Sequence, residues 1–147
     1  MTRVHLVVDA ANVIGSRPDG WWRDRPGAAA RLVGQLSAAL VAGALDPPVT
    51  VVLEGAARAG VAAGPVVAAG PVSAAGPEVA AGPGTIARLL VVHADRDGDS
   101  AIVAIVHSLV ADGHAEVAVV TADRALQERV RAVRSTVHGP SWLLARL

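Results

Sequence analysis

The 147-residue sequence contains no cysteine, lysine, phenylalanine or tyrosine, and it has only three tryptophans. Without cysteine there can be no disulfide, no thiolate metal ligand and no cysteine nucleophile, and nothing points to an oxidising compartment. The 13 arginines balance 13 acidic residues, so net charge gives no argument for a nucleic-acid partner. No apolar run approaches the roughly 20 residues that a membrane-spanning helix needs. We therefore expect a cytoplasmic protein without membrane contact.

The residues that replace the missing aromatics are small. Alanine, valine and leucine supply almost all of the 52% apolar content. Side chains of this kind suit a buried parallel sheet covered by alanine-rich helices. The length is about that of one domain. We therefore expect residues 1–147 to form a single α/β domain.

Four short apolar runs, each followed within a few residues by an acid, are predicted strands. They are residues 5–8, 49–53, 89–92 and 117–120, and residues 135–138 are a candidate edge strand. Apolar residues at helical spacing predict helices at 28–42, between Ile102 and Gly113, between Leu126 and Val133, and at 141–147 with Ser141 as N-cap. Strands that alternate with helices predict an open parallel sheet with helices on both faces.

Residues 62–85 depart from this pattern. They are four copies of a six-residue unit that begins Ala-Ala-Gly-Pro. A proline in every copy excludes a helix or an interior strand. Hexapeptide repeats can build a coil of a parallel β-helix, but Glu78 interrupts the aliphatic position. We interpret these repeats as a disordered or polyproline-like surface insert without chemistry, within a low-complexity insert that spans about residues 56–85.

Acidic residues gather where the predicted strands end. They are Asp9 after the first strand, Glu54 after the second, Asp95, Asp97 and Asp99 after the third, and Asp123 after the fourth. In open α/β sheets, ligands bind beyond the carboxyl ends of the strands. Carboxylates bind Mg²⁺ and Mn²⁺ while the ion keeps several waters. The sequence thus predicts a divalent-cation site at this edge of the sheet.

Each of these carboxylates also has an ordinary structural interpretation. Asp99 and Asp123 precede predicted helices, where Asp is a favoured N-cap worth about 1 kcal/mol. Glu54 can equally be a solvated charge at the end of a strand. Asp9 is different, because it lies within Val-Val-Asp-Ala-Ala-Asn-Val. An uncompensated carboxylate in a buried strand is costly, so this context favours a functional role.

Three motifs resemble, in order, those of NYN domains in the PIN-like nuclease superfamily. Residues 9–15, Asp-Ala-Ala-Asn-Val-Ile-Gly, resemble the opening D-x-x-N-V/L motif of the family. Residues 98–103, Gly-Asp-Ser-Ala-Ile-Val, resemble its second acidic motif at a helix start. Residues 121–124, Thr-Ala-Asp-Arg, are similar to its third, T/S-x-D. Together they span nearly the whole chain apart from the repeats.

The resemblance implies a three-layer fold with the strand order 3-2-1-4-5 and metal ligands at Asp9, Asp99 and Asp123. Asn12 would orient a water or a carboxylate, and Thr121 would support the site through its hydroxyl. Ser100 stands where many relatives carry a second acid, so the fourth ligand would be Glu54 or a loop Asp. Mg²⁺ or Mn²⁺ held in this way can activate water and hydrolyse an RNA phosphodiester without a side-chain nucleophile.

The loop after the first motif supplies candidate substrate contacts. With Thr121, the candidates are Arg17, Trp21, Trp22, Arg23 and Arg25. Stacking of a base on tryptophan is worth roughly 1 to 3 kcal/mol, and arginine can hold phosphates. The alternative is that both tryptophans cover the first predicted long helix.

Three functions remain open at this point. The first is a metal-dependent ribonuclease that acts on single-stranded or structured RNA, for which a homodimer is a further candidate assembly. The second is a metal-dependent nucleotide phosphohydrolase, which is disfavoured because none of the four glutamates forms a helical E-x-x-E pair. The third is a non-catalytic RNA-binding domain, which Ser100 makes credible.

Overall fold

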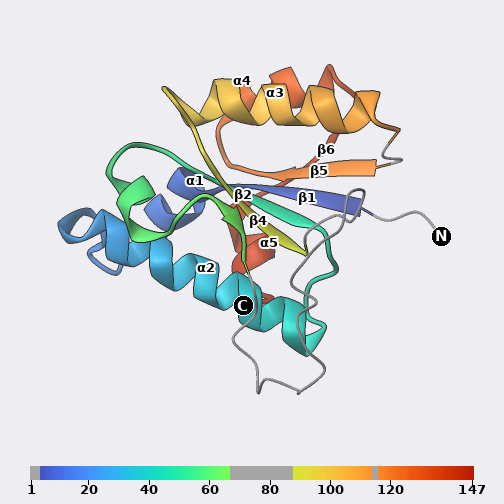
Figure 1. Ribbon diagram of the computed structural model, residues 1–147. Helices are drawn as coiled ribbons and strands as arrows, with labels where there is room; N and C mark the ends of the chain where they lie inside the picture. The colour runs from blue at the N-terminus through green and yellow to red at the C-terminus, as the bar shows by residue number, and fades with distance from the viewer. Residues whose placement is uncertain (1–3, 67–87, 114–115) are drawn as a thin grey trace.

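The computed structural model describes residues 4–66, 88–113 and 116–147. These residues form a six-stranded sheet in the order β3-β4-β2-β1-β5-β6 (Figure 1). The strands are β1 (Val4–Asp9), β2 (Val49–Leu53), β3 (Gly64–Pro65), β4 (Leu89–His93), β5 (Glu116–Val120) and β6 (Thr136–His138). The five strands that the sequence predicts are parallel and lie in the predicted order 3-2-1-4-5, which is confirmed. The short edge strand β3 was not predicted, and it runs antiparallel to β4.

Helices cover both faces of this sheet, so the domain has three layers (Figure 1). One face carries α1 (Ala10–Gly15), α2 (Arg25–Ala42) and α5 (Pro140–Leu144), and the other carries α3 (Gly98–Ala111) and α4 (Arg124–Arg131). Two short 3₁₀ helices, η1 (Trp21–Arg23) and η2 (Gly55–Gly60), lie in the connections. Among the described helices, none is long and apolar enough to cross a membrane.

The central strand β1 is buried on both faces. Leu6 and Val8 pack into the cluster that includes α1, α2 and α5, whereas Val7 packs into the cluster beneath α3 and α4. Side chains alternate between the two faces along a strand. Asp9 therefore follows Val7 onto the face that carries α3, at the carboxyl end of the strand.

Helix boundaries follow the capping residues. Asp24 accepts the backbone N–H of Gly27 at 2.9 Å, so α2 begins three residues earlier than the predicted start at residue 28. Gly43 ends this helix with a φ of 79°, which suits glycine. The predicted N-cap at Ser141 is wrong, because α5 begins at Pro140 after Gly139. A proline fits the first helical position, since its missing N–H would have no partner there.

The structure describes the first part of the expected insert, which contains η2 and β3. Residues 55–60 form η2, and Arg58 donates to the carbonyl oxygen of Ala94 at 3.2 Å. Pro65 lies in the edge strand, a position that needs no backbone donor. The rest of the expected insert, residues 67–85, falls outside the described residues.

Candidate active site

The strand register brings the ends of three strands to one edge of the sheet. Asp9 lies beside Val52 of β2, and its neighbour Val8 lies beside Val120 of β5. Glu54 and Thr121, which follow β2 and β5, consequently flank Asp9 on its two sides. We call this edge the acidic rim, and its members are Asp9, Glu54, Asp99 and Asp123.

Asp9 is the most buried of these acids, with 6% of its surface exposed. Its Oδ2 accepts the hydroxyl of Thr121 at 2.9 Å, and its Oδ1 accepts the backbone N–H of Asn12 at 3.4 Å. Burial raises the pKa of Asp9 from 3.8 to about 6; the two hydrogen bonds oppose this shift, and the charges of Asp99 and Glu54 add to it. A carboxylate in this environment gains strongly from a neighbouring cation.

Thr121 and Asn12 connect the first motif to the third. The Thr121 hydroxyl that donates to Asp9 also accepts the backbone N–H of Asp123 at 3.1 Å. The Asn12 side-chain oxygen accepts the backbone N–H of Ala122 at 2.9 Å. The oxygen of Asn12 thus holds the loop after β5, and its expected role in orienting a water or a carboxylate stays a prediction. Thr121 is fully buried, and its hydroxyl supports Asp9; its expected substrate contact stays a prediction.

Of the three acids after β4, Asp97 is a helix cap, Asp99 is a member of the rim and Asp95 is exposed. Asp97 caps α3 by accepting the backbone N–H of Ser100 at 2.7 Å, which makes the alternative of Asp99 as N-cap wrong. Asp99 lies in the first turn of α3, and burial and then the charges of Asp123, Glu54 and Asp97 raise its pKa. Its side chain is therefore electrostatically coupled to the other acids.

Glu54 and Asp123 each have one oxygen in a structural hydrogen bond. Glu54 accepts the backbone N–H of Gly98, the first residue of α3. Asp123 caps α4 by accepting the backbone N–H of Leu126 at 3.1 Å. The capping alternative thus holds for Asp123. A carboxylate has a second oxygen, so both residues keep acceptor capacity for a ligand.

The donors on the rim have the chemistry that hard cations prefer. As the side chains stand, however, the described residues contain no group of three or more His, Asp or Glu that could hold a metal ion. Mg²⁺ commonly uses one or two carboxylates and fills its remaining positions with water and phosphate oxygens. The rim fits a cation bound in that manner, not a closed cage of protein ligands.

A hollow of about 450 Å³ adjoins the rim at Glu54; we call it the rim hollow. Its lining comes from α1, η1, the start of α2, Glu54 with η2, and the loop after β4: Ala11, Ile14, Trp21, Arg25, Glu54, Gly55, Ala57, Arg96 and Asp97. It brings together two expected substrate contacts, Trp21 and Arg25. Arg96 was missed by the sequence analysis, although it is the one cation between the flanking loop acids at 95 and 97.

The other expected substrate contacts do not line this hollow. Arg17 donates to the side-chain oxygen of Gln35 on α2 at 2.8 Å. Trp22 is 56% exposed, and Arg23 lies 5.9 Å from the centroid of its ring. A second overlooked cation is Arg129 of α4. Its charge adds to the lowering of the Asp97 pKa, which comes mainly from the hydrogen bonds with Ser100, and it opposes the raised pKa of Asp99. Its positive charge therefore acts on both acids.

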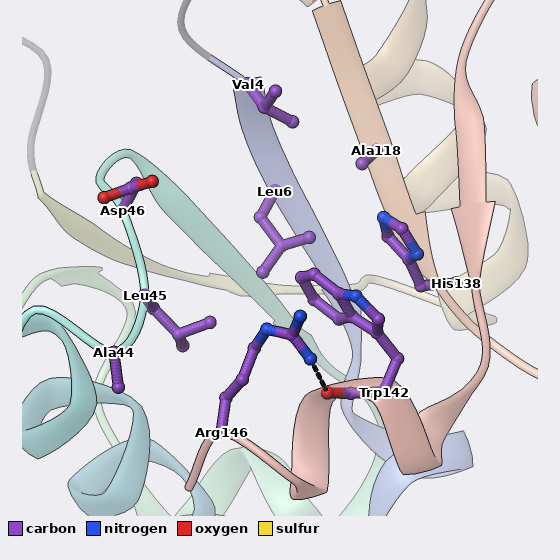
Figure 2. A pocket seen from close by; sticks show the side chains of 9 residues that line it. All are labelled: Val4, Leu6, Ala44, Leu45, Asp46, Ala118, His138, Trp142 and Arg146. Carbon is purple, nitrogen blue, oxygen red and sulfur yellow. Dashed lines mark hydrogen bonds between the residues drawn. The ribbon is translucent and has the colours of Figure 1, made fainter.

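A separate hollow of about 300 Å³ lies beside α5, on the same face of the sheet as α2; we call it the α5 hollow (Figure 2). Leu6 of β1 contributes to it, and Figure 2 shows the indole of Trp142 between the His138 ring and Arg146. The two rings stack with centroids 4.0 Å apart, and Arg146 lies 4.0 Å from the Trp142 centroid. None of the four rim acids lines this hollow.

Comparisons with known proteins bear on the fold. No family model matches the sequence, and no curated protein matches it. Among solved structures, the chain is similar to a mutant of Rae1 (YacP) from Bacillus subtilis, with a TM-score of 0.60 and 17% sequence identity. The match covers 96% of this chain and 72% of Rae1. At this identity the likeness shows a shared fold, and the class that the architecture defines is an α/β domain of PIN-like fold.

Proposed function

We propose that this chain is a ribonuclease of the NYN type that hydrolyses RNA phosphodiester bonds with Mg²⁺ or Mn²⁺ bound at the acidic rim. The observation that carries the proposal is the burial of Asp9, with its raised pKa, beside Glu54, Asp99 and Asp123 at the carboxyl edge of the sheet. Several acids around a buried carboxylate lower the stability of a fold, because they repel one another. Carboxylates with pKa values perturbed in this way are common at functional sites.

The chain's own residues would orient the ligands. Thr121 and the backbone of Asn12 hold both oxygens of the Asp9 carboxylate, and the cap of α4 fixes Asp123. A cation at the rim would use one or two of the carboxylates of Asp9, Asp99, Asp123 and Glu54 and complete its shell with water and phosphate oxygens; when bound it would polarise a water and the phosphate. Arg25 and Arg96 at the adjoining rim hollow would attract the phosphates of the substrate.

A non-catalytic RNA-binding domain is the second candidate. It is favoured by the absence, within the described residues, of three acidic or histidine side chains already placed to hold a metal. Ser100 in place of the family's second acid points in the same direction. RNA binding without cleavage would be the observable difference.

The experiment is cleavage of labelled single-stranded RNA by the purified protein with Mn²⁺, with Mg²⁺ or with EDTA. We expect cleavage with either metal, none with EDTA, and a rate lower by about 100-fold or more for Asp9→Asn. The matched control is Asp112→Asn, an exposed acid at the other end of α3, which lies roughly 20 Å from the rim by helix rise. Full activity of Asp9→Asn would overturn the proposal.

The same samples separate the alternatives. Mn²⁺ should raise the melting temperature of the wild type but not of Asp9→Asn, because an ion that binds the native state stabilises it. Binding of RNA without any cleavage would indicate the binding domain. Release of phosphate from nucleotides, with RNA left intact, would indicate a phosphohydrolase.

A further inference from the structure

The rim hollow combines three kinds of chemical group in one small space. The Trp21 indole supplies an aromatic surface, Arg25 and Arg96 supply positive charge, and Glu54 belongs at once to the hollow and to the acidic rim. A molecule that occupies this hollow therefore lies beside Glu54 of the acidic rim.

Trp21 is held in place before any ligand arrives. It packs against the core cluster that contains Ile14, and a Cβ built on Gly15 would lie 3.9 Å from its Cζ2. The Trp22 ring meets it edge-on, with centroids 5.9 Å apart and planes at 88°. An aromatic side chain ordered in this way loses little conformational entropy on binding.

The two arginines approach from different segments. Arg25, the first residue of α2, places its guanidinium 5.4 Å from the Trp21 ring centroid. Arg96 comes from the loop between β4 and α3, and both side chains belong to exposed residues. Aromatic surface next to guanidinium groups is the combination with which proteins hold single-stranded nucleic acids, since it serves base and phosphate together.

The size and position of the hollow limit what can enter. At about 450 Å³ it falls within the range of roughly 300 to 1,000 Å³ that small-molecule sites occupy. A base in a duplex is paired and stacked, so its faces are not available to a protein ring unless the nucleotide is unpaired or extruded.

We infer that the rim hollow binds one unpaired RNA nucleotide, with its base stacked on Trp21 and its phosphate at Arg25 and Arg96. The inference rests on the proposed function and deepens it, because it makes single-stranded RNA the substrate and places one nucleotide beside the rim.

The chain supplies its own control for this inference. Trp142 and Arg146 form a second tryptophan–arginine pair, and Trp142 is partly buried against the same core cluster as Trp21 (Figure 2). That pair lines the α5 hollow, which none of the rim acids lines. Trp142→Ala therefore reproduces the loss of a packed indole without touching the rim hollow.

The experiment measures binding of a fluorescent single-stranded oligoribonucleotide and of the same sequence as a duplex, in EDTA so that no cleavage occurs. Trp21→Ala should weaken single-strand binding about tenfold, and Trp142→Ala should leave it within about twofold. Arg25→Gln and Arg96→Gln should each weaken binding and reduce the slope of log affinity against log salt by about one. Every variant should bind the duplex weakly and equally.

Melting temperatures show whether each variant is folded. Wild-type affinity of folded Trp21→Ala, or an equal loss with Trp142→Ala, would overturn the inference. If Trp21→Ala does not fold, the double variant Arg25→Gln/Arg96→Gln tests the inference, because both arginines are exposed. Unchanged RNA binding by this variant would overturn the inference. If RNA binding depends on Trp21 but no metal-dependent cleavage occurs, the proposed ribonuclease activity is refuted and the nucleotide site is retained. If metal-dependent cleavage occurs and neither cleavage nor binding depends on Trp21, the nucleotide site is refuted and the ribonuclease activity is retained.

Discussion

At the scale of single residues, Asp9 carries a cost that the fold does not need. Its pKa in the folded chain is about 6, against 3.8 for an ordinary Asp, chiefly because the carboxyl is buried. The folded state therefore binds more protons than the unfolded chain between these two values. The stability that Asp9 contributes is fully present below pH 3.8 and is lost as the pH rises through about 6.

Asp9→Asn should accordingly stabilise the protein at neutral pH. At about 1.36 kcal/mol per pKa unit, the free energy of unfolding at pH 7.5 should rise by at most about 3 kcal/mol. At pH 4, where Asp9 is protonated in the fold, the gain should nearly vanish. Urea denaturation at the two pH values measures both quantities, with Asp112→Asn as the exposed control. If Asp9→Asn were less stable than the wild type at pH 7.5, the ionised carboxylate of Asp9 would not destabilise the folded state, and the prediction would be wrong.

The burial of Asp9 at the end of β1 could be predicted from the sequence, because the residue lies inside the apolar run Val-Val-Asp-Ala-Ala-Asn-Val. The roles of Asp97 and Asp99 could not be predicted in the same way. Both residues lie near the start of α3, and which of them caps it depends on where the first turn closes. If the helix began two residues later, Asp99 would be the cap and would not be a member of the rim.

At the scale of elements, η2 forms one wall of the rim hollow and depends on one glycine. A Cβ built on Gly60 would fall on the carbonyl oxygen of Pro26 and 3.0 Å from its Cα, so η2 and the start of α2 meet backbone to backbone. Gly60→Ala should force the two apart and cost about 1 to 3 kcal/mol of unfolding free energy. RNA binding through the rim hollow should weaken as well. Thermal denaturation and the oligonucleotide assay measure the two effects.

Gly34 provides the matched control. It lies inside α2, and a Cβ built on it meets nothing within 4 Å. Gly34→Ala should therefore stabilise the protein by about 0.5 to 1 kcal/mol, because alanine loses less backbone entropy in a helix. Equal destabilisation by both substitutions would mean that the contact with Pro26 is not what matters at position 60.

The parallel strands were predictable because runs of β-branched and aliphatic residues end at acids. The elements η2 and β3 were not predictable, since their composition of alanine, glycine and proline resembles that of the repeats that follow. Long-range contacts order them: Arg58 donates to Ala94, and His93 donates to the carbonyl oxygen of Val61 at 2.7 Å. Helix α1 was missed because six residues are too few to show a helical period.

At the scale of the whole molecule, the rim is closed by hydrogen bonds between segments about 110 residues apart. Asn12 at the start of α1 accepts from Ala122, and Thr121 donates to Asp9. The likeness of the first and third motifs to the family predicted that these segments would meet. It did not predict the bond of Asn12 to Ala122, because a side chain–backbone contact depends on the loop conformation.

Asn12→Ala should separate positioning from folding. The change leaves the Ala122 N–H without its side-chain acceptor, and we expect about 1 kcal/mol lower stability. Cleavage should fall by about tenfold, because the loop that carries Asp123 loses its anchor, and Asn12→Asp, which retains an acceptor oxygen, should preserve the loop. Amide hydrogen exchange at Ala122 reports the loop directly. Unchanged exchange in Asn12→Ala would show that the hydrogen bond does not hold it.

The two-residue strand β3 has a consequence for the behaviour of the molecule in solution. The core strands are built of valine and leucine, and a bare edge of such a sheet is a template on which strands of other molecules can grow. Val66 donates to Leu89 at 2.8 Å and so occupies a carbonyl on the edge of β4, while Pro65 presents no N–H of its own. The edge strand β3 therefore contains a proline, which cannot donate a backbone hydrogen bond to a strand of another molecule. This position disfavours edge-to-edge aggregation of the valine-rich sheet.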